Sequence, residues 1–367
     1  MVSLVRFAGR CRLAFFLLAA AALVCLPTTS GAVEPASPPA GWGLVGAPGA
    51  GVRLDKQNTY REQASLHLHA AGWAQVLQEI SAANYRGHRV MFRGVAKVEK
   101  MPAGALMYVR VDGPGTSEFA SATTEKQSVK FSGTTDWRNF SLVVNVPKQA
   151  QDLLLGLAAN GPGDLWVADM EFKVVDNNVP LSPEESGMDQ PGNVQRRPAR
   201  WSNGWSIVSN DLSAYQASTA TPVDLKTPAY FVNGNPHQER GQATPWAALE
   251  QEMDATPYQG SMLSLATRLK AVGVSRGMLS AHTEDAAGAL LTKAQSSHDL
   301  RKDVSWTDET VHLQIPKNAV KLVISVSLVG GGELWCTGFK PTFDNDYKPR
   351  ENERTVVLPR APLSLRF

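Results

Sequence analysis

The sequence predicts an all-β protein, with a signal peptide followed by two tandem β-sandwich domains. Three observations support this fold class. The second half of the 367-residue chain repeats the first, short segments alternate apolar with polar residues, and no long segment has a convincing helical period. Many short strands separated by turns rich in Gly, Pro, Asn and Asp are typical of β-sandwiches.

The first 32 residues have the three parts of a secretory signal peptide. Three arginines precede an apolar run at 13–26, and the small residues Ser30 and Ala32 stand at −3 and −1 of a cleavage site after Ala32. This run is shorter than the roughly 20 residues that span a bilayer, so no transmembrane segment is expected after cleavage. We therefore expect a periplasmic or secreted protein. Lipid attachment at Cys25 remains an alternative, although the preceding Val24 is bulkier than the residue that lipidation favours.

Charge and cysteine content exclude some functions. Removing residues 1–32 takes away three arginines and no acidic residue, which leaves 33 basic and 34 acidic side chains. A nearly neutral chain without a basic stripe argues against nucleic acid as a partner. Cys336 is the one cysteine left in the mature chain, so neither an internal disulfide nor a thiolate zinc site can form.

The internal repeat sets the domain organisation. GWGLVG at 41–46 matches GWSIVS at 204–209, and the offset between the copies is 163 at Trp42, 173 at Trp73 and 169 at Trp137. Insertions and deletions therefore fall in loops. The predicted parts are a signal peptide at 1–32, a first domain at 41–179, a polar linker at 180–200, a second domain at 201–346 and a C-terminal tail at 347–367, which could lie along a sheet edge or remain loose.

The segment GWAQVLQEISAANYRG at 72–87 could be read as a helix or as a strand. The helical stripe that starts at Trp73 would place Glu250 in the middle of the corresponding stripe in the second copy. The alternate residues from Ala74 to Ile80, in contrast, keep their character in the second copy, as a strand requires. We therefore predict a strand in both copies.

Other segments show plainer strand signals. Residues 140–146 and 310–315 alternate and stop at prolines, and 322–329 is rich in β-branched residues and ends in three glycines. Residues 89–97 and 105–111 are predicted to be neighbouring strands, joined by a turn through Pro102-Ala-Gly104.

The order of the motifs resembles a known family of domains. A GW-x-hydrophobic-x-G segment, a glutamine-bearing strand, YRG-x-R-V, GTTDW and GPGDLWVADMEF follow one another across 41–176, and more weakly across 204–345. This order is similar to that of jelly-roll carbohydrate-binding modules and galactose-binding-like sandwiches, above all a bacterial version found beside AraC-type or sigma-factor regulators. The resemblance implies two jelly rolls. No helix-turn-helix signal accompanies them, and Glu118-Phe-Ala-Ser121 departs from that version's usual motif.

Aromatic residues are the candidate ligand contacts, because sugar faces stack on aromatic rings. The tryptophans kept in both copies are more often structural, since each buries a large area; they are Trp42, Trp137, Trp166, Trp205, Trp306 and Trp335. We predict ligand contacts instead from aromatics on variable loops and on the concave face: Trp73, Tyr85, Tyr108, Tyr230, Trp246 and Tyr258.

Metal ligands are less well supported. His67 and His69 would share one strand face as half of a metal site, but a third ligand is not evident, so a structural role is expected. The resemblance implies calcium near Asp169, and an oxygen-rich cluster begins at Asp176, although Asp and Asn also stabilise turns. No other cofactor is expected.

The predicted function is that of an exported, non-catalytic protein that binds a glycan or another cell-envelope component. The alternatives are a periplasmic protein–protein interaction or sensor-partner module and, less favoured, a glycan-acting hydrolase whose carboxylates come from distant loops. The G-x-S-x-G match at 273–277 is interpreted as chance, because no helix follows it.

Overall fold

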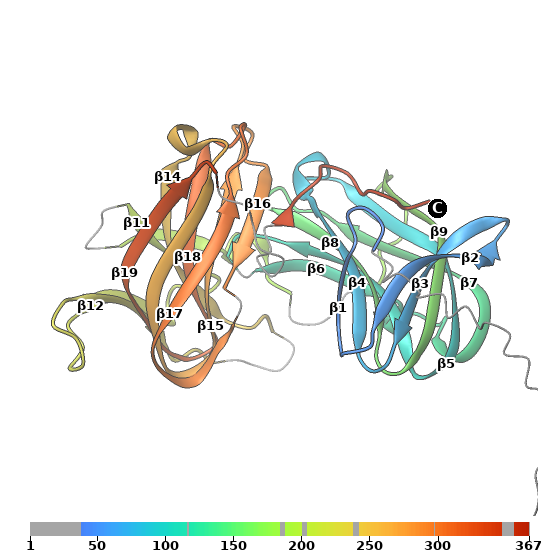
Figure 1. Cartoon of the computed structure of the whole chain (residues 1–367), viewed down its shortest axis with the longest axis horizontal. Helices are drawn as coiled ribbons and strands as arrows, with labels where there is room; N and C mark the ends of the chain where they lie inside the picture. The colour runs from blue at the N-terminus through green and yellow to red at the C-terminus, as the bar shows by residue number, and fades with distance from the viewer. Residues whose placement is uncertain are drawn as a thin grey trace, which may run out of the picture. The chain divides into compact units, whose positions relative to one another are not determined.

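Each repeat folds into a curled β-sheet that closes on itself as two packed layers (Figure 1). The computed structural model describes residues 38–115, 117–183, 188–199, 204–237, 242–296, 298–346 and 356–366. The first repeat contains β1 (Gly43–Gly46), β2 (Gly51–Tyr60), β3 (Gln63–Ala70), β4 (Ala74–Ser81), β5 (Arg89–Asp112), β6 (Glu118–Thr123), β7 (Phe131–Asn145), β8 (Asp152–Ala159) and β9 (Gly163–Val175). The predicted signal peptide lies outside the described residues.

The second repeat follows the same plan. It contains β10 (Gln195–Pro198), β11 (Trp205–Ser209), β12 (Tyr215–Ala220), β13 (Ala229–Gly234), β14 (Trp246–Asp254), β15 (Met262–Glu284), β16 (Leu290–Gln295), β17 (Leu300–Gln314), β18 (Lys321–Val329), β19 (Gly332–Asp344) and β20 (Val356–Val357). Short 3-10 turns lie at Ala82–Asn84, Thr124–Lys126, Pro191–Asn193 and Thr256–Tyr258. The predicted all-β class with two tandem sandwiches is confirmed.

Two long strands build both layers of their repeats. The C-terminal half of β5 joins β8 and β6 in layer A, which has the order β1-β4-β8-β5-β6. Its N-terminal half joins β7 and β9 in layer B, which has the order β7-β5-β9-β3-β2. In the second repeat β15 divides in the same way, so that layer A contains β14, β18 and β16 and layer B contains β17, β19 and β13.

The continuity of β5 corrects one prediction. Residues 89–97 and 105–111 belong to a single strand and are not neighbours joined by a turn. Pro102 lies in the register shift between Met101 and Ala105, where β5 needs no ladder hydrogen bond. A proline at a bulge bends a strand without ending it, which allows the strand to pass from one layer to the other.

The ambiguous segment at 72–87 contains strand β4, and its counterpart contains β14, so the strand prediction is confirmed. Ala74, Val76 and Ile80 point into the core with no exposed surface, as alternation requires. The predicted linker range includes β10, which pairs with β11, and the tail includes β20, which pairs with the edge of β16. Within the described ranges, no helix is long and apolar enough to cross a membrane.

Candidate functional site

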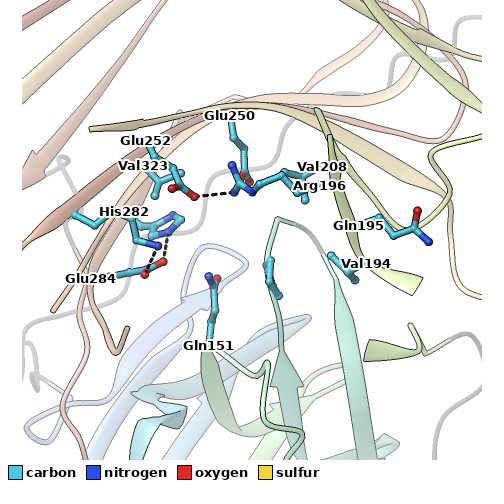
Figure 2. Close-up of a pocket in the computed structure, with 12 residues that line it drawn as sticks. Gln151, Val194, Gln195, Arg196, Val208, Glu250, Glu252, His282, Glu284 and Val323 are labelled. Atoms are coloured by element: carbon cyan, nitrogen blue, oxygen red, sulfur yellow. Dashed lines mark hydrogen bonds and ion pairs between the residues drawn. The ribbon is translucent and has the colours of Figure 1, made fainter. Parts of the chain in front are cut away.

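The outward face of layer A in the second repeat carries a cluster of acidic and basic side chains (Figure 2). Because successive side chains of a strand point to opposite faces, residues two apart on β14 and β15 reach the same surface. We call this surface the charged face; its members are Arg196, Glu250, Glu252, His282, Glu284 and Lys321.

Hydrogen bonds and ion pairs connect these side chains. The Arg196 guanidinium pairs with the buried carboxylate of Glu250 and reaches Glu252 Oε1 at 3.0 Å. Glu284 accepts from His282 Nε2 at 3.2 Å (Figure 2) and from Lys321 Nζ at 2.7 Å. Three carboxylates and three basic groups therefore occupy one face in near balance.

Burial and pairing act differently on the two central acids. Burial raises the pKa of Glu250, and the nearby Arg196 offsets only part of that rise. Burial also raises the pKa of Glu284, but the hydrogen bonds from His282 and Lys321 outweigh it and lower the pKa to about 2. Glu284 is therefore a firmly ionised acceptor.

A cavity of about 220 Å³ opens over the charged face. Val194, Val208 and Val323 supply apolar lining, and Gln151 of the first repeat points toward the same space (Figure 2). Since one water needs only roughly 10–15 Å³ of such volume, the cavity can hold several waters or a small polar ligand.

The first repeat has charged side chains at equivalent positions. Asp112 of β5 lies opposite Asp152 of β8, as Glu284 lies opposite Lys321 in the second repeat. Arg110 Nη2 is 2.7 Å from Asp112 Oδ2, and Glu79 lies one strand further along layer A. Burial, together with the negative charge of Asp152, raises the pKa of Asp112 to about 7.

The cluster in the first repeat is partly closed. Lys293 Nζ of β16 is 2.7 Å from Asp152 Oδ2 and 3.1 Å from Glu79 Oε1. Buried atoms without a hydrogen-bond partner in the described part of the chain include Glu79 Oε2, Arg110 Nε and Asp112 Oδ1. Such atoms are rare in folded proteins and often mark a place for water or a ligand.

Among the predicted ligand contacts, Tyr108 lies on the outward face of layer A in the first repeat. Its hydroxyl donates to Gln75 Oε1 at 3.0 Å. Its ring lies over Gly156 of the adjacent strand, where an added Cβ would come within 2.0 Å of the ring. Trp73 directly precedes β4, two residues before Gln75, and is 48% exposed. These two aromatic rings belong to the same layer of the first repeat.

Three of the other predicted aromatics pack against neighbouring rings and, like Tyr108, are half-buried. Tyr85 packs edge-on against Phe172 with ring centroids 5.0 Å apart, and Tyr258 stacks on Phe343 at 3.7 Å. Tyr230 lies beside Trp205 at 5.7 Å. Each of these three residues is half-buried.

Trp246 occupies the same face of β14 as Glu250, but it is covered. Only 1% of Trp246 is exposed, and Val194 and Val208 pack against it. Its indole N–H donates to Asp189 Oδ2 at 3.4 Å. In this structure the ring therefore fills space and is not available for stacking.

The predicted metal-binding residues are dispersed. His67 Nε2 and His69 Nδ1 both bond to Asp164 Oδ1, at 2.8 and 2.9 Å, so their shared partner is a carboxylate. Asp169 lies within β9 with a positive φ of 48°, and Asp176 follows the end of that strand. Within the described ranges, no three His, Cys, Asp or Glu side chains form a group able to hold a metal ion.

Sequence reasoning missed the charged face, although a signal was present. Glu250 and Glu252 stand two residues apart on a predicted strand, and this spacing places both on one outward face. His282 and Glu284 have the same spacing on β15, but no strand was predicted there. Arg196 could not have been found in this way, because it lies in the range predicted as linker.

Comparisons with known proteins give weak similarities. No protein-family model matches the chain. The chain is 24% identical over 155 residues to an uncharacterized HTH-type transcriptional regulator, YbfP, of Bacillus subtilis (strain 168); the match covers 41% of this chain and 50% of the relative. This chain therefore spans about half the length of that relative.

Similar solved structures include carbohydrate-binding modules. The tandem CBM22-1–CBM22-2 domain of Paenibacillus barcinonensis Xyn10C is 12% identical with a TM-score of 0.28, and the match covers 82% of this chain and 93% of that one. The C-terminal family 22 module of Clostridium thermocellum Xyn10B is 18% identical with a TM-score of 0.29, and the match covers 38% of this chain and 89% of that one.

Proposed function

We propose that this chain is an exported, non-catalytic protein that binds neutral carbohydrate on the outward face of layer A. The observation that carries the proposal is the charged face of the second repeat, where three carboxylates and three basic groups supply donors and acceptors in near balance. A strongly anionic or cationic ligand would meet as much repulsion as attraction on such a surface.

Sugar hydroxyls suit this arrangement because each hydroxyl both donates and accepts hydrogen bonds. Glu252 and Glu284 supply acceptors, and Lys321 supplies donors. Hydrogen bonds to charged groups contribute about 1.5–3 kcal/mol each, so a few of them give measurable affinity. In the first repeat, Tyr108 and Trp73 add aromatic surface against which the apolar face of a sugar can stack.

The pairing of the carboxylates favours binding over hydrolysis. A glycosidase needs one carboxyl as acid and a second as nucleophile or base. Here Glu284 is held by His282 and Lys321, and Glu250 by Arg196. These contacts keep Glu284 ionised as a fixed acceptor and hold the Glu250 carboxyl, whose pKa is raised by burial, against Arg196.

A glycan array probed with the purified mature chain tests this function. We expect retention on neutral glycans that changes little between low and moderate salt, because the ligand carries no charge. Glu252→Gln and Tyr108→Ala should weaken retention, and Lys340→Ala, at an exposed position of β19, serves as the matched control. Absence of signal on every neutral glycan, or binding confined to charged glycans, would refute the proposal.

A further inference from the structure

We propose a second carbohydrate surface, on layer B of the second repeat, that holds an extended neutral polysaccharide. This surface, the tryptophan row, consists of Trp306 on β17, Lys270 on β15, Trp335 on β19 and Phe231 on β13. The inference rests on the proposed carbohydrate-binding function and adds a site on a different layer.

Strand pairing places these side chains side by side. Lys270 pairs with Trp335, and Trp335 pairs with Phe231 in the ladder. The rings of Phe231 and Trp335 lie 4.4 Å apart, and Lys270 Nζ lies 6.0 Å from the centre of the Trp306 ring. With neighbouring strands about 4.8 Å apart, the row extends over roughly 14 Å, which is long enough for several linked sugars.

The first repeat has the same row in a closed form. Lys97 pairs with Trp166, which pairs with His67, and Trp137 stands where Trp306 stands in the second repeat. His67 stacks on Trp166 at 4.6 Å, and both side chains are buried. The indole N–H of Trp166 donates to Asp55 Oδ2 at 2.8 Å, and this contact fixes the ring against β2.

The second repeat leaves its row open. Trp306, Trp335 and Phe231 are each partly exposed, and the neighbouring Val272 is 42% exposed. Exposed apolar surface concentrated at one place on a sheet often marks a binding site. The first repeat buries Trp166 and His67 at the positions where the second repeat partly exposes Trp335 and Phe231, whereas Trp137 and Trp306 are partly exposed in both repeats.

Charge and shape identify the ligand class. Lys270 pairs with Asp224 at 2.7 Å, so the centre of the row is neutral, and Glu333 accepts from the Trp335 indole at 3.2 Å. Aromatic rings bordered by hydrogen-bonding groups match a sugar chain, which has apolar C–H faces and polar hydroxyl edges. The row lies on an open sheet face, where a short sugar makes few contacts, so a long chain binds better than a short one.

The test compares two kinds of ligand on the same variants. Retention of the mature chain on insoluble cellulose, xylan and chitin is measured by depletion, and binding of soluble cellohexaose and xylohexaose by calorimetry. We expect the double variant Trp306→Ala/Trp335→Ala to bind the polysaccharides at least tenfold more weakly than wild type. Its affinity for the soluble oligosaccharides should stay within twofold of the wild-type value. Trp335→Phe, which keeps a ring, should retain most polysaccharide binding.

Trp137→Ala in the first repeat is the matched control and should leave retention unchanged, with circular dichroism confirming the fold of each variant. Unchanged retention in the double variant would overturn this inference while leaving the charged face as the binding site. Equal losses for the polysaccharides and the soluble oligosaccharides would also overturn it. Failure of the wild-type chain to bind any of these sugars would overturn this inference, whereas the proposed function is decided by the glycan array.

Discussion

Replacing Glu284 by Gln tests how the charged face is held together. Glu284 is buried and accepts from both His282 and Lys321, which lower its pKa from 4.5 to about 2. At 1.36 kcal/mol per pKa unit, this shift corresponds to about 3 kcal/mol of stability at neutral pH. Removing one partner of a buried ion pair has a similar cost, about 3–5 kcal/mol.

The effect has a defined pH dependence. Because the folded-state pKa of Glu284 lies below its unfolded value, the stabilisation is fully present above about pH 5 and is lost as the pH falls toward 2. Urea unfolding followed by tryptophan fluorescence should show the midpoint of Glu284→Gln lowered by about 1 M at pH 7, with an m-value of about 3 kcal/mol/M. The difference from wild type should shrink at pH 3.

The matched control is Glu99→Gln, because Glu99 pairs with Lys100 at 3.2 Å on the exposed surface. Exposed pairs contribute about 0–1 kcal/mol, so this variant should unfold nearly as wild type does. A loss of stability in Glu284→Gln that does not change with pH, or one no larger than that of Glu99→Gln, would show that the ion pairs of Glu284 do not stabilise the charged face.

Three further predictions concern packing and access. Trp246→Ala should lower the free energy of unfolding by about 3–5 kcal/mol because the ring is buried, and an unchanged denaturation midpoint would contradict this. Cys336 is fully buried, and burial raises the pKa of its thiol. It should therefore react with a thiol reagent only after unfolding, and fast labelling of the native chain would contradict this. Gly156→Ala should displace the Tyr108 ring and weaken glycan binding at least tenfold in calorimetry. Gly51→Ala is the control and should bind as wild type does, because an added Cβ there meets nothing within 4 Å. Equal affinities for the two variants would contradict the assigned role of the ring.

Alternation along the strands made much of the fold predictable from sequence. The comparison of the two copies showed that alternate residues of 72–87 keep the same apolar or polar type, which predicted a strand. Strands β4 and β14 are present at these positions. The path of β5 was not predictable in the same way, because Pro102 and Gly104 are as typical of a turn as of a bulge. Only the pairing of the two halves with different strands distinguishes these cases.

The candidate site was less accessible to sequence reasoning, because it depends on contacts between distant strands. Tyr108 was identified as an aromatic on a predicted concave strand, and it lies on the outward face of layer A. Trp246 looked equivalent to Trp73, yet one ring is buried and the other exposed. What differs is the covering: Val194, from the segment between the two repeats, packs against Trp246.

A crystal structure of the mature chain with the neutral sugar that binds best on the array would show directly whether the outward face of layer A holds the ligand. We expect sugar hydroxyls within hydrogen-bond distance of Glu252, Glu284 or Lys321, or a sugar ring against Tyr108. A sugar bound only at loops away from both faces, with the charged side chains unchanged and free of contacts, would contradict it.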